Sequence, residues 1–228
     1  MNYLFSLIPV VIYITLLVLL DSFALVRKQS IAYAMGCGMV LCGVAFVVSL
    51  GLEKCLYFVP LLEEMLKGCV VLYLVIGKKI RFFAEALILG AAAGAGFALA
   101  ENIVYVYYLG DSLAPADALF RGMGTALMHV GLAGLSGVML LFLASRQYLK
   151  HKDDKKYMPL WLVYLLTLMP SVLLHYAFNT YINQLPSAVV LGIMATFMLL
   201  LFFFLLKLNE RAVNDYLEPS MSTTVQLL

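Results

Sequence analysis

The chain has 228 residues, of which 64% are hydrophobic and 12% are charged, and its formal net charge is +2 at pH 7. Soluble domains are about half apolar and about a quarter charged, so this composition excludes a soluble globular domain and indicates a protein that lies mostly in a bilayer. The sequence contains no basic aromatic patch of the kind that binds nucleic acid, and its four cysteines form no C-x-x-C pair. We therefore predict neither a nucleic-acid partner nor a disulfide framework.

Apolar runs long enough to cross a membrane, which takes about 20 residues, recur along the chain. The predicted spans cover residues 3–26, 31–52, 56–77, 83–108, 120–144, 159–182 and 185–206. The first run lacks the basic start of a signal peptide, so we expect it to be retained as a span. The prediction is an all-α membrane protein, a bundle of seven transmembrane helices. Residues 1–210 form its single domain and residues 211–228 a short cytoplasmic tail.

Lysine and arginine residues gather in alternate connections. Of the 15 basic residues, 12 follow the first, third, fifth and seventh predicted spans, whereas the connections on the other side hold only Lys54 and Arg121. Cytoplasmic loops of membrane proteins collect lysine and arginine. This division predicts a multi-pass protein of the cell membrane with its N-terminus outside and its C-terminus in the cytoplasm.

Ionisable residues interrupt four of the predicted spans. Charged groups inside a bilayer are costly and usually mark function. These residues are Glu63, Glu64 and Lys67 in the third span, Glu101 in the fourth, His129 in the fifth and His175 in the sixth. At a rise of about 1.5 Å per residue, the groups on all four helices lie roughly 10–14 Å below the outer boundary. Because they share one depth, we predict that they form one site.

Residue spacing and residue type indicate what this site can do. Lys67 lies four residues after Glu63 and three after Glu64, so either carboxylate can pair with its ammonium group. His175 and Asn179 lie four residues apart on one helix face. A buried carboxylate can act as a general base towards water, and histidine or asparagine can donate to an oxyanion. Glutamate and histidine are also zinc ligands, so hydrolysis and metal binding both fit.

Four motifs carry these residues. They read E-E-M-L-K at 63–67, G-F-A-L-A-E-N-I-V-Y at 96–105, R-G-M-G-T-A-L-M-H at 121–129 and P-S-V-L-L-H-Y-A-F-N at 170–179. In order, spacing and placement on the spans they resemble the PrsW family of intramembrane proteases, over residues 56–182. That family is related to the CaaX-processing membrane proteases and to the structural subunit of gamma-secretase.

The resemblance implies roles for individual residues. The implied catalytic residues are Glu63, Glu64, Glu101, His129, His175 and Asn179. The glutamate pair would supply the general base, and the asparagine would assist at the oxyanion. The implied supporting residues are Lys67, Asn102 and Arg121. In a zinc enzyme the ligands would be Glu101, His129 and His175, whereas a metal-free glutamate mechanism is proposed for the CaaX-type relatives.

The predicted function is endoproteolysis of the site-one type, in which a membrane-anchored protein is cut near the outer face of the membrane. The family implies a substrate similar to an anti-sigma factor. Two other functions stay open, a non-catalytic scaffold like the gamma-secretase subunit and an ion or proton transporter, because buried Glu and His also form proton relays. Three buried carboxylates argue against a scaffold, and an apolar inner half of the bundle argues against a transporter.

Overall fold

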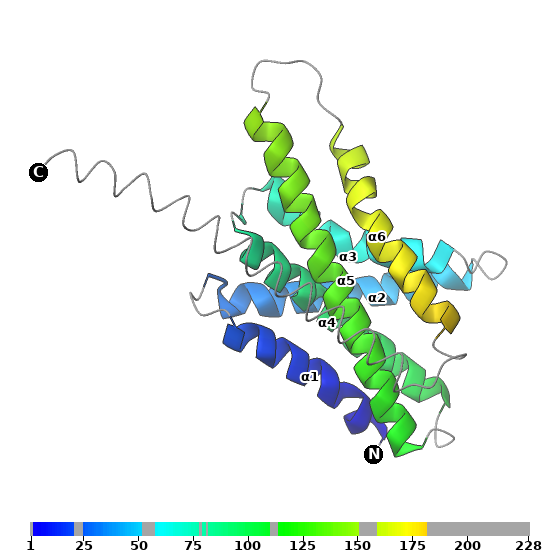
Figure 1. Cartoon of the computed structure of the whole chain (residues 1–228). Helices are drawn as coiled ribbons and strands as arrows, with labels where there is room; N and C mark the ends of the chain where they lie inside the picture. Colours follow the sequence, from blue (N-terminus) through cyan, green and yellow to red (C-terminus); the bar gives the residue numbers. More distant parts are fainter. Residues whose placement is uncertain are drawn as a thin grey trace, which may run out of the picture.

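The computed structural model describes residues 2–20, 25–51, 58–77, 79–80, 82–109, 114–150 and 159–181. Within these ranges the chain is all-helical, without strands (Figure 1). The helices are α1 (Asn2–Leu20), α2 (Lys28–Leu50), α3 (Val59–Ile76), α4 (Phe83–Leu109), α5 (Pro115–Lys150) and α6 (Leu160–Tyr181). The all-α prediction is confirmed for this part of the chain, and the predicted span at 185–206 lies outside the described residues.

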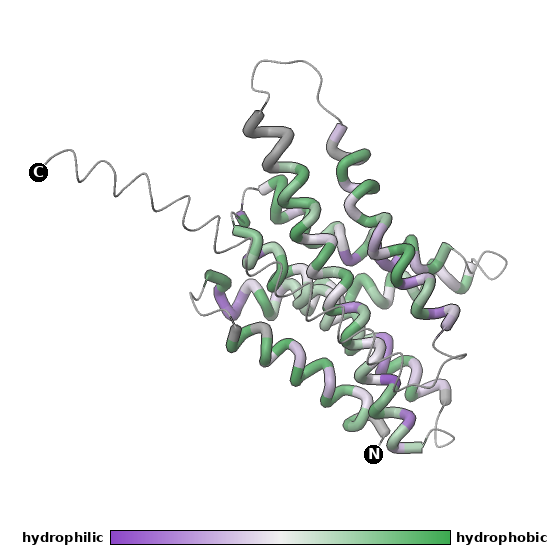
Figure 2. Tube along the Cα trace, viewed as in Figure 1, coloured by the Kyte–Doolittle hydropathy of each residue, from purple (hydrophilic) through white to green (hydrophobic). Residues whose placement is uncertain are grey.

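Four of these helices, α2, α4, α5 and α6, are long and apolar enough to cross a membrane. Helix α1 contributes an apolar stretch from Leu4 to Leu16. Helix α3 has 18 residues and is also largely apolar, but it carries three charged groups, Glu63, Glu64 and Lys67. Figure 2 shows helices that are hydrophobic along most of their length, interrupted by short hydrophilic stretches. The described helices therefore fit a multi-pass membrane protein.

Helix α5 is longer than its predicted span of 120–144. It has 36 residues and begins at Pro115, with Asp117 in its first turn. Proline is favoured at the first helical position, and an acidic side chain near a helix N-terminus interacts favourably with the helix dipole. At the other end, residues 145–150 contain neither glycine nor proline, so nothing in the sequence stops the helix where the apolar run ends.

Helix α4 lies at the centre of the bundle, where it packs against α1, α2, α3 and α5 (Figure 1). A Cβ atom added at Gly94 would overlap the carbonyl oxygen of His129 in α5, and one added at Gly96 would overlap that of Met35 in α2. Small residues at such positions allow helix backbones to come into direct contact within membranes. The glycine- and alanine-rich part of α4 therefore sets the positions of both neighbouring helices.

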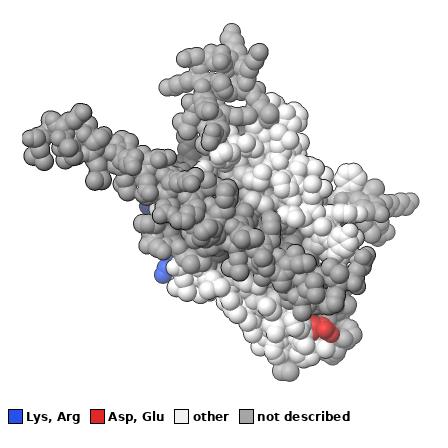
Figure 3. Space-filling view, viewed as in Figure 1, with Lys and Arg blue, Asp and Glu red and all other residues white. Residues whose placement is uncertain are grey.

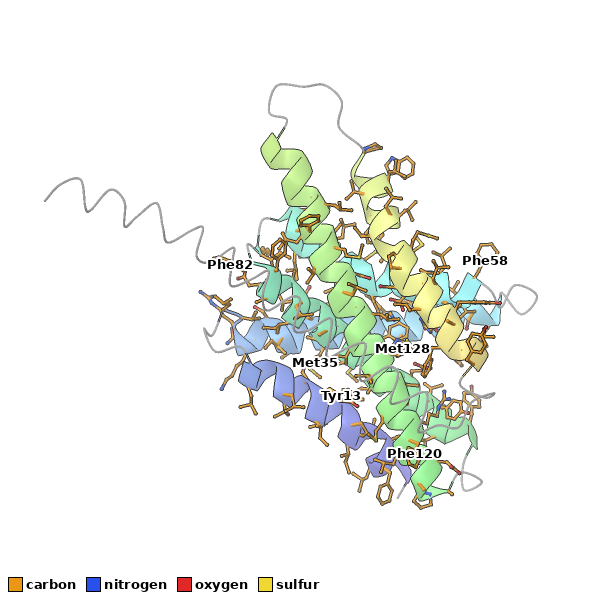
Figure 4. The ribbon with its side chains drawn as sticks, in the orientation of Figure 1. Tyr13, Met35, Phe58, Phe82, Phe120 and Met128 are labelled. Carbon is orange, nitrogen blue, oxygen red and sulfur yellow. The ribbon has the colours of Figure 1, made fainter. Side chains whose placement is uncertain are left out.

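Large apolar side chains cover the outside of the helices. Leu19, Val40 and Trp161 are each more than 60% exposed, as expected for groups that face lipid. On the face drawn in Figure 3, charged groups are sparse among the described residues. Figure 4 labels Met128, which is buried within the bundle, and Phe120, which is exposed near the start of α5. Such an apolar surface suits contact with lipid rather than with water.

Candidate active site

The two adjacent glutamates of α3 have different surroundings. The Glu64 side chain is fully buried, and its Oε1 accepts hydrogen bonds from Lys67 Nζ at 2.5 Å and from His175 Nδ1 at 2.8 Å. The Glu63 side chain is 15% exposed, and its Oε2 lies 3.6 Å from His175 Nε2. Among the described residues, this Oε2 atom has no hydrogen-bond partner. The Oε2 atom of Glu64 is likewise buried without a partner, so the two residues differ in that Glu64 Oε1 is held by two donors whereas the Glu63 side chain is partly exposed.

Lys67 joins α3 to α5 at the centre of the site. Its side chain is fully buried, and Nζ lies 2.8 Å from His129 Nδ1 in addition to its contact with Glu64. The ammonium group also lies 5.1 Å from the centre of the Phe97 ring, a cation–π distance. Because an ammonium group only donates, His129 Nδ1 accepts, and the proton of a neutral His129 ring is on Nε2.

The proton on His129 Nε2 points to a third carboxylate. Nε2 lies 2.5 Å from Glu101 Oε2, and the other oxygen of Glu101 lies 3.8 Å from Arg121 on the first turns of α5. Arg121 in turn stacks on the Tyr105 ring. The side chains of Glu101 and Arg121 are about 30% exposed. This end of the network is therefore accessible from outside the bundle, whereas the Lys67 end is fully buried.

The described structure brings five of the six predicted catalytic residues into one connected network. Two chains of contacts leave Lys67, one through Glu64 to His175 and the other through His129 to Glu101. The two imidazole rings close the gap between the chains, because their centres lie 5.3 Å apart in a perpendicular arrangement. Four helices thus contribute to a single cluster, which is the arrangement that the common depth predicts.

One group within this cluster has the composition of a metal site. Glu63, His129 and His175 each offer a ligand atom, and these atoms all lie within 4.8 Å of one another. Glutamate with two histidines is the ligand set of several zinc peptidases. The set predicted from the sequence has Glu101 in place of Glu63, and Glu101 contacts His129 directly instead.

The donor chemistry fits a metal at His175 better than at His129. His175 donates a hydrogen bond from Nδ1 to Glu64, so the lone pair of its Nε2 faces Glu63. Metal-binding histidines are usually oriented by a carboxylate in this way. The unpaired Glu63 Oε2 atom is a second free ligand. His129 has both ring nitrogens engaged, so it would exchange its hydrogen bond to Glu101 for the metal.

The remaining predicted residues lie around this cluster. Asn102 is buried, and its side chain donates to the carbonyl of Ser6 in α1 at 3.3 Å and accepts from the Thr125 hydroxyl of α5 at 2.9 Å. It therefore joins three helices beside Glu101. Asn179 lies one turn beyond His175 but is exposed, so it lies at the edge of the network.

Sequence reasoning did not single out the polar residues that hold α6. The Tyr164 hydroxyl donates to the Met65 carbonyl of α3, and Ser171 lies 2.8 Å from Ser136 of α5. Tyr164, Thr167, Ser171 and His175 are all buried and recur every three or four residues. This polar stripe along the sixth span is a signal in the sequence, and it marks the face of α6 that points into the bundle.

Comparison with known proteins gives a family but no individual relative. No curated protein and no solved structure matches the chain. The sequence profile described as PrsW family intramembrane metalloprotease matches residues 24–207, a range that includes every residue of the cluster. The match confirms the resemblance of the four motifs and favours a protease over a scaffold or a transporter. The chain belongs to the PrsW family of intramembrane metalloproteases.

Proposed function

We propose that this intramembrane protease is an endopeptidase of the site-one type that cuts a membrane-anchored protein near the outer face of the cell membrane, with Glu63 as the general base. The observation that carries the proposal is the contrast between the two glutamates of α3. Glu64 is fully buried and held by Lys67 and His175, whereas the Glu63 side chain is 15% exposed and lines a cavity between α2 and α4. A base must reach the proton that it removes, and of these two glutamates Glu63 is the accessible one.

In the proposed mechanism, water enters on the side of Glu63, and the Glu63 carboxylate takes a proton from it as the water oxygen attacks the scissile carbonyl. The same carboxyl group then gives the proton to the leaving amine when the C–N bond breaks. Glu64 holds the His175 ring through Nδ1, so that Nε2 stays directed at the same space. In a metal-free enzyme, His129 would turn its Nε2 proton from Glu101 to the oxyanion, whereas in a zinc enzyme it would be a ligand instead. Asn179 is a further donor at the edge of the site. Lys67 fixes the position of Glu64 relative to His129, because its ammonium group contacts both side chains.

Zinc is the proposed cofactor, and the residues present fit it. His129 and His175 would hold the ion together with one of the two carboxylates that face them, Glu63 or Glu101. Bound zinc would polarise the scissile carbonyl and acidify the attacking water. If Glu101 is the carboxylate ligand, Glu63 keeps its role as the base.

The topology of the sequence prediction belongs to this proposal. Seven spans, an N-terminus outside and a C-terminus in the cytoplasm put the cluster nearer the outer face, since the lysine and arginine residues follow the odd-numbered spans. Residues 1–210 would form the single membrane domain and residues 211–228 its cytoplasmic tail. The substrate would be a membrane-anchored protein similar to an anti-sigma factor, as the family resemblance implies.

The test is cleavage of a single-span reporter by the purified protein in liposomes. Glu63→Gln should lower kcat by roughly 10²–10⁴, the usual contribution of a general base. Asp117→Asn makes the same chemical change at an exposed residue of α5 and should leave the rate unchanged. Cleavage by the Glu63→Gln protein at the wild-type rate would remove Glu63 as the base. If the His175→Gln protein, still folded, also kept that rate, the site itself would be wrong.

A metal requirement is tested in the same assay. A zinc enzyme loses activity with a membrane-permeant chelator such as 1,10-phenanthroline and regains it when Zn²⁺ is added back, whereas a metal-free enzyme does neither. Elemental analysis of the purified protein then identifies the ion. The Glu63→Gln variant also distinguishes Glu63 from Glu101 as the carboxylate ligand, because it lowers the zinc content only if Glu63 binds the ion.

A further inference from the structure

A cavity of about 280 Å³ lies beside the active site, between α2, α3 and α4. One wall is formed by α2 from Met39 to Ser49 and the other by α4 from Phe97 to Val104. Glu63 of α3 and Glu101 of α4 both line it. The cavity therefore adjoins the two carboxylates on the more open side of the site.

Apart from these carboxylates, the lining is mainly apolar and includes the small residues Gly43, Ala45 and Ala100. The Phe97 ring belongs to the lining and also lies 5.1 Å from the His129 ring. A group inside the cavity is therefore separated from the catalytic histidine by one aromatic ring. Such a space suits an apolar side chain whose backbone stays near Glu63 and Glu101.

The size of the cavity limits what it can hold. Pockets for drug-sized ligands measure roughly 300–1,000 Å³, so this space is at the lower limit and fits one side chain rather than a helix. Two other cavities in the described part of the chain are larger, about 550 Å³ near Cys69 and about 400 Å³ near Lys79. Neither is lined by a residue of the Glu/His cluster, so neither is next to the chemistry.

We propose that the cavity between α2 and α4 receives the apolar side chain of the substrate residue next to the scissile bond, and that Gly43 sets the size of the side chain it accepts. This inference rests on the proposed endopeptidase function. A side chain bound in this cavity would place its own peptide bond next to Glu63, which lines the cavity. A side chain bound in either of the other two cavities would not.

Gly43 stands at a position where a side chain would enter free space. A Cβ atom added there meets no heavy atom within 4 Å, and the residue is exposed. Gly38 on the same helix differs, because a Cβ atom there would overlap the carbonyl oxygen of Ala93. Helix packing thus requires glycine at position 38 but not at 43, and a larger residue at 43 would reduce the cavity without moving α2.

Gly36 offers a matched control. It lies two helical turns before Gly43, is also exposed, and a Cβ atom added to it likewise meets nothing within 4 Å. It lines the cavity near Cys69 instead of the one beside the site. The variants Gly43→Leu and Gly36→Leu therefore add the same side chain to the same helix, and only the first should alter substrate choice.

The experiment uses the full-length protein in liposomes and four single-span reporters that differ only in the residue before the cut, Ala, Val, Leu or Phe. For the Gly43→Leu protein, kcat/KM for the Leu and Phe reporters should fall at least tenfold relative to the Ala reporter, within the roughly 10–200-fold that pocket size can discriminate. For the Gly36→Leu protein, the same ratio should stay within about twofold of wild type. Mass spectrometry of the products checks that the cut has not moved.

A second measurement does not depend on proteolysis. Cys42 lines the cavity, so in a background without the other three cysteines its modification by N-ethylmaleimide should be slower in Gly43→Leu than in Gly36→Leu. If labelling slows but the reporter ratio is unchanged, the cavity is filled without effect on the substrate and the inference is overturned, while the protease assignment stands. If the wild-type protein cuts no reporter, the proposed function fails and this inference fails with it. Gly43→Ala should show a smaller shift in the same direction if the leucine variant does not fold.

Discussion

Replacement of Lys67 by methionine is the most direct test of the network. The variant keeps most of the side-chain volume against Phe97 but removes the ammonium group. Glu64 then stays fully buried with His175 as the donor to Oε1, and its Oε2 atom already lacks a partner among the described residues. A buried charge that loses its partner destabilises a protein by about 3–5 kcal/mol. We expect a loss of this size in the free energy of unfolding.

A double variant separates the charge effect from the loss of packing. Lys67→Met combined with Glu64→Gln removes both charges and leaves an amide oxygen that can still accept from His175 Nδ1. Most of the lost stability should return, because removal of both members of a buried ion pair is often close to neutral. The Glu64→Gln single variant completes the cycle and gives the coupling energy between the two residues.

The assay is unfolding in mixed micelles by titration with sodium dodecyl sulfate, followed by circular dichroism and by protection of native cysteines from modification. The reasoning would be refuted if Lys67→Met changed the free energy of unfolding by less than about 1 kcal/mol, a small part of the loss expected for an unpaired buried charge. It would also be refuted if the double variant were less stable than Lys67→Met alone. In either case Lys67 and Glu64 would not form the buried pair that the site requires.

Three further results are expected. Gly94→Ala should lower both the free energy of unfolding and the rate of reporter cleavage, because the added methyl group would displace α5 at His129. Gly36→Ala should change neither quantity, and equal effects of the two variants would contradict the direct contact between the helices. Asn179→Ala should reduce kcat less than Glu63→Gln does, because Asn179 is exposed at the edge of the network, and equal losses would place it at the reacting atoms. In intact cells, a cysteine introduced at Lys150 should react with an impermeant maleimide only after the cells are opened, and labelling from outside would reverse the proposed orientation.

Much of the site is predictable because it depends on one-dimensional information. The number of residues between a span boundary and a polar group gives its depth, and four such counts agree on one level. The i,i+3 relation between Glu64 and Lys67 predicts a possible ion pair from spacing alone, and the two side chains form that pair at 2.5 Å. Composition and hydropathy are likewise sufficient to predict helices and a membrane environment.

Other features depend on how the helices rotate and pack, which a single sequence does not contain. Glu63 and Glu64 are neighbours of the same type, and it is the position of His175 on another helix that holds one and leaves the other free. The exposure of Asn179 has the same origin, since it depends on what covers the end of α6. The greater length of α5 reflects favourable helix ends outside the apolar run, which a search for apolar spans does not register.

The direct contact of α4 with two neighbours links substrate size to catalytic geometry. Gly96 meets the backbone of α2 beside the cavity, and Gly94 meets the backbone of α5 at His129, with no flexible side chain in between to absorb movement. If a bulky group forced α2 and α4 apart, the displacement of α4 would be passed directly to α5 at His129. Selectivity in this enzyme is therefore best altered by substitutions that change side-chain size along the cavity without moving a helix. A substitution that shifts a helix would also change the relative positions of the catalytic side chains.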